Sequence, residues 1–295
     1  MTFEVSSQAI AALRSRSGFA EAMRADAQTT VTLFRGNILV NTLMNDRARA
    51  LFVLAAFYLH HGGTAEGRPG LTVGALKDLC VRLGLCSRGR CEAMLALLRA
   101  GGYFAPAPHD DRRRRPLVPT AKLVALQVER WRGHFAAIAK VLPEAQRHLA
   151  ALDDPAFVRD FMLALGDGFV GGFRVLTHTP DLALFAERNA GIPILFALAL
   201  EGGEEGPFPP AVPVHLSINR LATQFAVSRK HVLTLLRDAE VAGLLVRGPE
   251  PDRVMLLPRV RDGLEQFFAA VFLYFSGCAA QALSTSRADA AEPVG

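Results

Sequence analysis

The chain has 295 residues, of which 51% are hydrophobic, and its formal net charge is +5 at pH 7. This length suffices for about two domains of roughly 150 residues each, and the positive charge favours a polyanionic partner. Three of the four cysteines, Cys80, Cys86 and Cys91, crowd together, unlike the spread expected of a disulfide framework. Residues 1–12 lack the basic start and apolar core of a secretory signal, so we expect a cytoplasmic protein.

The N-terminal segment, residues 1–44, is expected to be helical over Ser7 to Gln28 and mixed after that. Residues 45–142 then form the first predicted domain. It contains helices at 47–60 and 73–83, followed by a turn and a helix that begins after Ser87. Ser87 is a suitable helix cap, because its hydroxyl accepts from an orphan backbone N–H. Gly101 and Gly102 end that helix, since glycine adopts the left-handed conformation without a Cβ clash.

A hairpin is predicted next. Tyr103-Phe104 and Leu117-Val118 read as two short strands, and the turn between them carries Arg112, Arg113, Arg114 and Arg115. A long helix then runs from Pro119-Thr120 to about Lys140. Residues 143–172 form a predicted helical linker, in which Gly166 to Gly172 mark the join between the two halves.

The second half, residues 173–283, repeats this plan, and residues 284–295 read as a disordered tail. Ser228-Arg229-Lys230-His231 matches Ser87 onward in residue type, and Gly243 falls where Gly102 does. The distance from Leu216 to Ser228 is about one helical turn shorter than its counterpart. A second hairpin follows Gly243. Such an internal repeat defines the domain organisation.

The order of helix, helix-turn-helix, basic hairpin and long helix resembles winged helix-turn-helix proteins, and in particular the multiple-antibiotic-resistance regulator (MarR) superfamily. In that superfamily, helices outside the winged domain form a homodimer. The resemblance implies a mainly α fold with small β-hairpin wings. It further implies two tandem winged helix-turn-helix repeats packed as a pseudo-dimer with extra helices, and a transcriptional regulator that binds double-stranded DNA.

The residues expected to contact DNA are basic or hydroxyl-bearing and lie at the two helix starts and the two wings. Arginine suits guanine edges, and basic wing tips suit the minor groove. The set is Ser87, Arg88, Arg90, Arg112, Arg113, Arg114, Arg115, Ser228, Arg229, Lys230, His231, Arg247 and Arg253. The second wing also carries Glu250 and Asp252. Because carboxylates repel phosphates, we expect this wing to bind DNA weakly or not to contact it.

No constellation of an enzyme, a metal site or a cofactor site is evident in the sequence. Cys86 and Cys91 flank the start of the helix after Ser87, where a thiolate is stabilised, so they are candidates for a redox role. Buried free cysteine is the simpler interpretation, and the C-x5-C-x4-C spacing matches no standard zinc pattern.

Residues 267–283 are nearly uncharged, and we interpret them as a buried packing helix rather than a membrane span. Its aromatic residues are expected to pack on the long helix of the first half or to form a homodimer. Two alternatives to a transcriptional regulator stay open: a DNA binder of the replication-initiator kind, and a tandem winged-helix scaffold for protein interactions.

Overall fold

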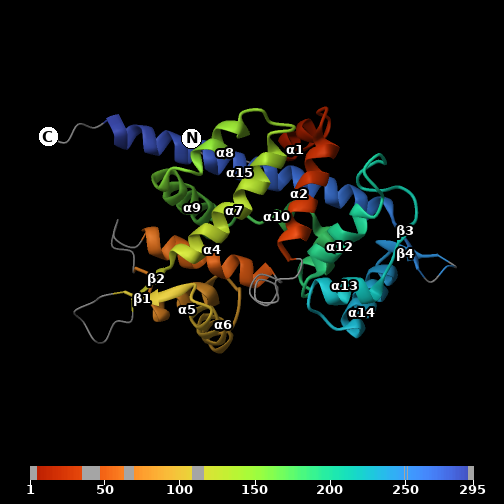
Figure 1. Ribbon diagram of the computed structural model, residues 1–295, viewed down its shortest axis with the longest axis horizontal. Helices are drawn as coiled ribbons and strands as arrows, with labels where there is room; N and C mark the ends of the chain where they lie inside the picture. Colours follow the sequence, from red (N-terminus) through yellow and green to blue (C-terminus); the bar gives the residue numbers. More distant parts are fainter. Residues whose placement is uncertain are drawn as a thin grey trace. The chain divides into compact units, whose positions relative to one another are not determined.

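The computed structural model describes residues 5–34, 47–62, 70–107, 116–248, 250 and 252–291, with backbone only at 47–50 and 287–291. This part of the chain is mainly helical with two small antiparallel sheets (Figure 1). The helices are α1 (Ser7–Arg14), α2 (Phe19–Phe34), α4 (Arg47–Gly62), α5 (Val73–Arg82), α6 (Arg88–Ala100), α7 (Ala121–Ile138), α8 (Ala145–Ala151), α9 (Pro155–Val170), α10 (Val175–His178), η1 (Pro180–Leu182), α11 (Ala183–Ala186), α12 (Gly191–Leu200), α13 (Ile218–Gln224), α14 (Arg229–Val241) and α15 (Pro258–Ala291). The strands are β1 (Phe104–Pro106), β2 (Leu117–Pro119), β3 (Val214–His215), β4 (Leu245–Arg247) and β5 (Arg253–Leu256).

The chain folds into two compact units, each assembled from several stretches. Unit 1 comprises Met1–Arg47, Gly133–Gln146 and Arg174–Tyr274, and unit 2 comprises Ala48–Arg132, Arg147–Phe173 and Phe275–Gly295. Each unit thus combines stretches that are distant in the sequence. Two helices pass from one unit to the other: α7 begins in unit 2 and ends in unit 1, and α15 does the reverse.

The core of unit 1 is centred on α12, which is buried along most of its length and packs closely against α2. Phe268 of α15 stacks on Phe196 of α12, with ring centroids 4.8 Å apart. Phe272, one turn further along α15, meets Phe19 of α2 edge to face at 6.2 Å. Phe268 and Phe272 are both fully buried, so these aromatic residues of α15 already have partners within the chain.

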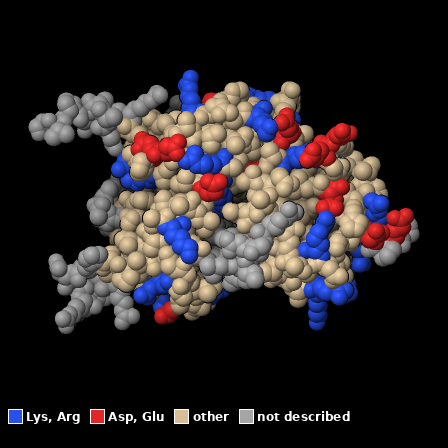
Figure 2. All heavy atoms as spheres, in the orientation of Figure 1, with Lys and Arg blue, Asp and Glu red and all other residues tan. Residues whose placement is uncertain are grey.

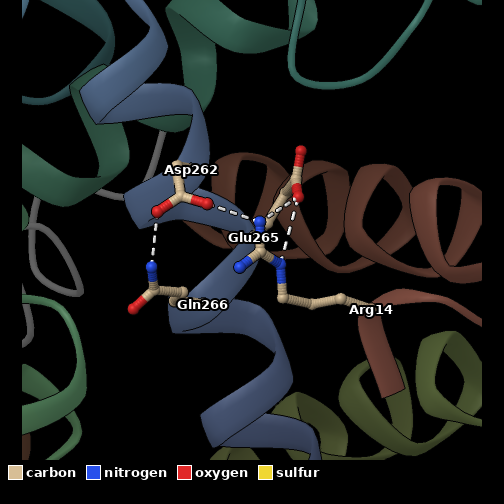
Figure 3. A network of polar contacts seen from close by, with 4 residues as sticks. All are labelled: Arg14, Asp262, Glu265 and Gln266. Atoms are coloured by element: carbon tan, nitrogen blue, oxygen red, sulfur yellow. Dashed lines mark hydrogen bonds and ion pairs between the residues drawn. The ribbon is translucent and has the colours of Figure 1, made fainter. Parts of the chain in front are cut away.

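A polar network joins α1 to the start of α15 in unit 1 (Figure 3). The Arg14 guanidinium donates from Nη2 to Asp262 Oδ1 at 2.5 Å and from Nε to Glu265 Oε2 at 3.1 Å. Gln266 Nε2 donates to the other oxygen of Asp262 at 2.5 Å. Because these groups are partly exposed, the network orients α1 more than it stabilises the unit.

The core of unit 2 is built on aromatic contacts to α9. Phe161 of α9 meets Trp131 of α7 edge to face at 5.1 Å and Phe275 of α15 at 6.1 Å. Gly166 lies inside α9, where the sequence predicted the glycine-rich join. A Cβ at Gly166 would lie 2.7 Å from the Tyr58 side chain of α4. The glycine therefore permits close packing of two helices, and α9 continues to Val170.

The N-terminal helix predicted over Ser7 to Gln28 is two helices, α1 and α2. Gly18, between them, has a φ of 83°, in the left-handed region that favours glycine. A Cβ there would also lie 2.7 Å from the Lys140 carbonyl oxygen. Both the backbone conformation and the close approach of Lys140 therefore require glycine at position 18.

Helix α15 extends to Ala291 and so includes residues that were predicted to belong to the disordered tail. The alanines in this last stretch are strong helix formers. Between Pro258 and Ser286 the helix is long and apolar enough to cross a membrane, a test that core helices of soluble proteins also pass; η1 and α11 with α12 pass it together as a bent pair.

Two hydrogen-bonded side-chain pairs of different burial join α2 to α7 and to the turn that follows α7, and together they allow a matched test. Asp26 Oδ1 lies 2.5 Å from His134 Nδ1, and both side chains are buried. Glu21 Oε1 lies 2.6 Å from Lys140 Nζ, and both of those are largely exposed.

We expect Asp26→Ala to lower the free energy of unfolding by about 1–3 kcal/mol, because it removes the carboxylate that is hydrogen-bonded to a buried imidazole. Glu21→Ala is the control, with an expected loss of about 1 kcal/mol or less. Urea denaturation of the two variants measures both values. Equal losses would contradict the structural role of the buried pair.

Candidate nucleic-acid interface

Two helix pairs with the same local design lie in different units: α5–α6 in unit 2 and α13–α14 in unit 1 (Figure 1). The second helix of each pair begins after a serine. Ser87 Oγ accepts from the backbone N–H of Arg90 at 3.3 Å, and Ser228 Oγ accepts from that of His231 at 3.1 Å. Both predicted caps are confirmed.

The turns between the paired helices differ by one residue. Gly84 and Ala226 each occupy the left-handed region, with φ values of 65° and 52°. Each is followed by a residue whose N–H closes the preceding helix: Leu85 bonds to the Cys80 carbonyl at 2.9 Å, and Val227 to that of Ala222 at 3.1 Å. Cys86 is the extra residue of the first turn. Since α5 has 10 residues and α13 has 7, the predicted difference of one helical turn lies mostly in these first helices.

The same positions of α6 and α14 face inward. Cys91, Leu95 and Leu98 of α6 are buried, and the residues at the matching distances from Ser228 are buried in α14, namely Val232, Leu236 and Ala239. The opposite face of each helix is therefore turned outward in the same register.

A hairpin follows each second helix, and the same backbone hydrogen bond sets the direction of the hairpin in both units. Gly102 and Gly243 are left-handed, with φ values of 74° and 67°. The next residue, Tyr103 or Leu244, then donates its N–H to the carbonyl of Leu98 or Ala239, at 2.9 Å in both cases. The first hairpin pairs β1 with β2, and the second pairs β4 with β5 and adds β3, a strand that the sequence did not predict.

The helix after each hairpin also binds the end of the second helix. Lys122 Nζ near the start of α7 donates to the Gly101 carbonyl at 2.9 Å. Arg259 Nη1 near the start of α15 donates to the Ala242 carbonyl at 3.1 Å. A cation suits the negative end of a helix dipole, so the contact fixes helix and hairpin together in both units.

The residues predicted to contact DNA at the start of α6 and α14 are exposed to solvent, with one exception. Ser87, Arg88, Arg90, Ser228, Arg229 and Lys230 are exposed, and Lys and Arg side chains lie over the region of α13 and α14 in Figure 2. The exception is His231, which is half-buried and whose Nε2 lies 2.7 Å from the Asn189 carbonyl oxygen. That contact occupies one of its two ring nitrogens.

The two helix starts differ in their ion pairing. Arg88 Nη1 of α6 lies 2.5 Å from Asp78 Oδ1 of α5, with both side chains mostly exposed. Within the described part of the chain, Arg229 and Lys230 of α14 form no ion pair. The second helix start therefore carries the less neutralised positive charge.

The predicted hairpin residues divide into one group outside the described residues and one group paired with carboxylates. Arg112, Arg113, Arg114 and Arg115 belong to the first group. Arg247 donates from its guanidinium to Glu240 Oε2 at 2.6 Å, and Arg253 Nε lies 3.5 Å from Glu250 Oε2. The hydrogen bond from the Arg247 side chain is the main reason that the pKa of Glu240 is lowered, so Glu240 stays charged and holds Arg247.

One outward residue was missed by the sequence analysis. Arg237 of α14 is exposed and forms no ion pair with any residue that the structure describes. It lies seven residues after Lys230, a spacing of about two helical turns, so both project from one face. That spacing could have identified it from the sequence.

The three crowded cysteines lie at the α5–α6 turn. Cys80 and Cys91 are fully buried, whereas Cys86 is half-buried. Hydrogen bonding between the Cys80 and Cys91 thiols raises the pKa of Cys80 and lowers the pKa of Cys91. Over the described ranges, no group of three or more histidine, cysteine or acidic side chains could hold a metal ion.

Comparison of the chain with protein-family models, with curated proteins and with solved structures found no match.

The thiols give a direct test of this geometry. Brief treatment of the folded protein with iodoacetamide is expected to alkylate Cys86 well ahead of Cys80, Cys91 and Cys278, because Cys86 is half-buried and the other three are buried. Peptide mass spectrometry measures the order, and labelling in denaturant, where all four thiols react, is the control. Alkylation of Cys91 as fast as Cys86 would show that the helix pair opens readily.

Proposed function

We propose that this chain binds double-stranded DNA as a transcriptional regulator, with α6 and α14 as its two recognition helices. The two helix pairs and hairpins would then be tandem winged helix-turn-helix repeats. The observation that carries the proposal is the matched design of the two helices. Each has a serine cap, an exposed basic first turn and three inward residues at the same spacing. A recognition helix presents its first turns to base edges and phosphates.

The arrangement of the chain supports a covalent pseudo-dimer. In the MarR superfamily, helices outside the winged domain join two copies. Here the helices that follow the two hairpins, α7 and α15, each contribute residues to both units. One chain would thereby present two recognition helices to half-sites about 10 base pairs apart, as dimeric helix-turn-helix proteins do.

The two wings would contribute unequally. The basic run at 112–115 supplies positive charge for the minor groove or the phosphates. In the second hairpin, Arg247 and Arg253 lie beside Glu240 and Glu250. The first repeat is therefore expected to provide more of the salt-dependent affinity.

Selection of bound duplexes from a randomised pool tests the proposal, at low and at moderate salt. The test variant is Arg88→Ala/Arg229→Ala, which removes one cation from each recognition helix. The control is Arg16→Ala/Arg147→Ala, which removes one exposed arginine from each unit away from those helices.

We expect the wild-type protein to select a two-part motif, and we expect the test variant to lose affinity for it by tenfold or more, since each lost base or phosphate contact costs about 1–3 kcal/mol. The control should retain most of its affinity. Retention without any motif would favour a non-specific binder. No retention at low salt would overturn the proposal in favour of a protein-interaction scaffold.

The second wing offers a separate prediction. Glu240→Gln removes the carboxylate that holds Arg247, so Arg247 becomes free to reach a phosphate. One added phosphate contact is worth about fivefold in affinity at 0.15 M salt. Glu144→Gln, an exposed residue of the same unit, makes the same change in net charge and serves as the control. Equal affinities of the two variants would show that the second wing lies out of reach of DNA.

A further inference from the structure

The outward faces of α6 and α14 carry different chemistry, although their inward faces match. When the two helices are aligned on Ser87 and Ser228, the three buried positions of α6 are also buried in α14, which buries Leu235 in addition. The same alignment places Gly89, Ala93 and Ala96 of α6 opposite Lys230, Thr234 and Arg237 of α14. These positions are spaced by four and then three residues, so each set lies along one side of its helix.

On α14 this side is polar and positively charged. Lys230 and Arg237 are exposed, Thr234 is half-buried, and neither cation has an ion-pair partner among the residues that the structure describes. The acidic residues of α14 are occupied elsewhere: Asp238 binds Arg188 at 2.6 Å, and Glu240 binds Arg247. The outward side of α14 therefore carries donors that no carboxylate of its own helix neutralises.

On α6 the corresponding side has no polar side-chain atoms at all. Gly89, Ala93 and Ala96 are exposed, and the nearby carboxylates pair with cations of the same helix pair. Glu92 lies 2.6 Å from Lys77, and Asp78 lies 2.5 Å from Arg88. A smooth face of this kind admits close approach of the helix and contact with thymine methyl groups, but it provides no donor for a guanine edge.

Resting on the proposed DNA-binding function, we infer that the two helices divide the work of binding. Helix α14 reads the base sequence through Arg237 and Lys230, whereas α6 lies in its groove with little base-specific contact. Arginine and lysine bind the O6 and N7 acceptors of guanine, which is the commonest specific contact in the major groove. Arg237 is the specificity-determining residue that this assigns. The preferred site is consequently asymmetric, with one half defined by guanine and the other half weakly specified.

The experiment compares wild type with Arg237→Ala in selection from a randomised duplex pool, followed by affinity measurements on single-base variants of the selected site. Arg147→Ala is the charge-matched control. Arg237 is exposed and unpaired within the described chain, so its removal should leave the fold intact, and circular dichroism verifies this.

We expect the wild-type motif to have one strong and one weak half. Arg237→Ala should lower base preference by about tenfold or more at one or two adjacent positions of the strong half, and Arg147→Ala should leave the motif unchanged. The reciprocal variant Gly89→Lys/Ala96→Arg should add a guanine preference to the weak half.

Two results would overturn the division of work. One is a wild-type motif with two equally strong halves that Arg237→Ala leaves unchanged. The other is a uniform loss of affinity for all sequences on Arg237→Ala, which would make Arg237 a phosphate contact. Failure of the wild-type protein to retain any duplex at low salt is a different result, because it removes the proposed function itself.

Discussion

The arrangement of each helix pair and its hairpin depends on one backbone hydrogen bond, which forms just after the second helix ends. In each unit a left-handed glycine reverses the chain, and the next N–H donates to a carbonyl of the helix's last turn. This bond sets the direction in which the hairpin leaves the helix. The next long helix then returns a cation to the same helix end, through Lys122 in one unit and Arg259 in the other. Helix, hairpin and following helix are thereby held as one piece, and the outward face of the helix follows from that geometry.

The buried positions of the two helix pairs differ in residue but stay apolar, whereas the exposed positions differ in charge. The two helix pairs differ in length only in the first helix and in the turn that follows it. The first helix of the pair is shorter in unit 1, and one extra residue, Cys86, enters the turn in unit 2. At the buried positions, Val232 and Ala239 replace Cys91 and Leu98, so apolar side chains are exchanged for one another. Packing selects for apolar volume, but it exerts no comparable constraint on the solvent-facing side.

Local features of this chain could be predicted from the sequence, but features that depend on distant contacts could not. The caps at Ser87 and Ser228 and the stops at Gly102 and Gly243 depend on neighbouring residues alone. The close approach of the Lys140 carbonyl to Gly18, and that of Tyr58 to Gly166, join segments that are distant in the sequence. Likewise, the division of α7 and α15 between two units depends on which core each turn enters. The pairing of Arg247 with Glu240 could not be foreseen, because it depends on the angle between the hairpin and α14.

If α6 and α14 are the two recognition helices that we propose, their union in one chain allows their sequences to differ, which a homodimer does not allow. In a symmetric homodimer both helices have one sequence, so its site approaches an inverted repeat. When two copies are joined in one chain, each outward face changes independently while the inward face stays under the demands of packing. The contrast between Gly89, Ala93 and Ala96 in α6 and Lys230, Thr234 and Arg237 in α14 has this form, because it is confined to outward positions. The differences of charge between the two helix pairs therefore lie on exposed positions, whereas the buried positions of both helices remain apolar.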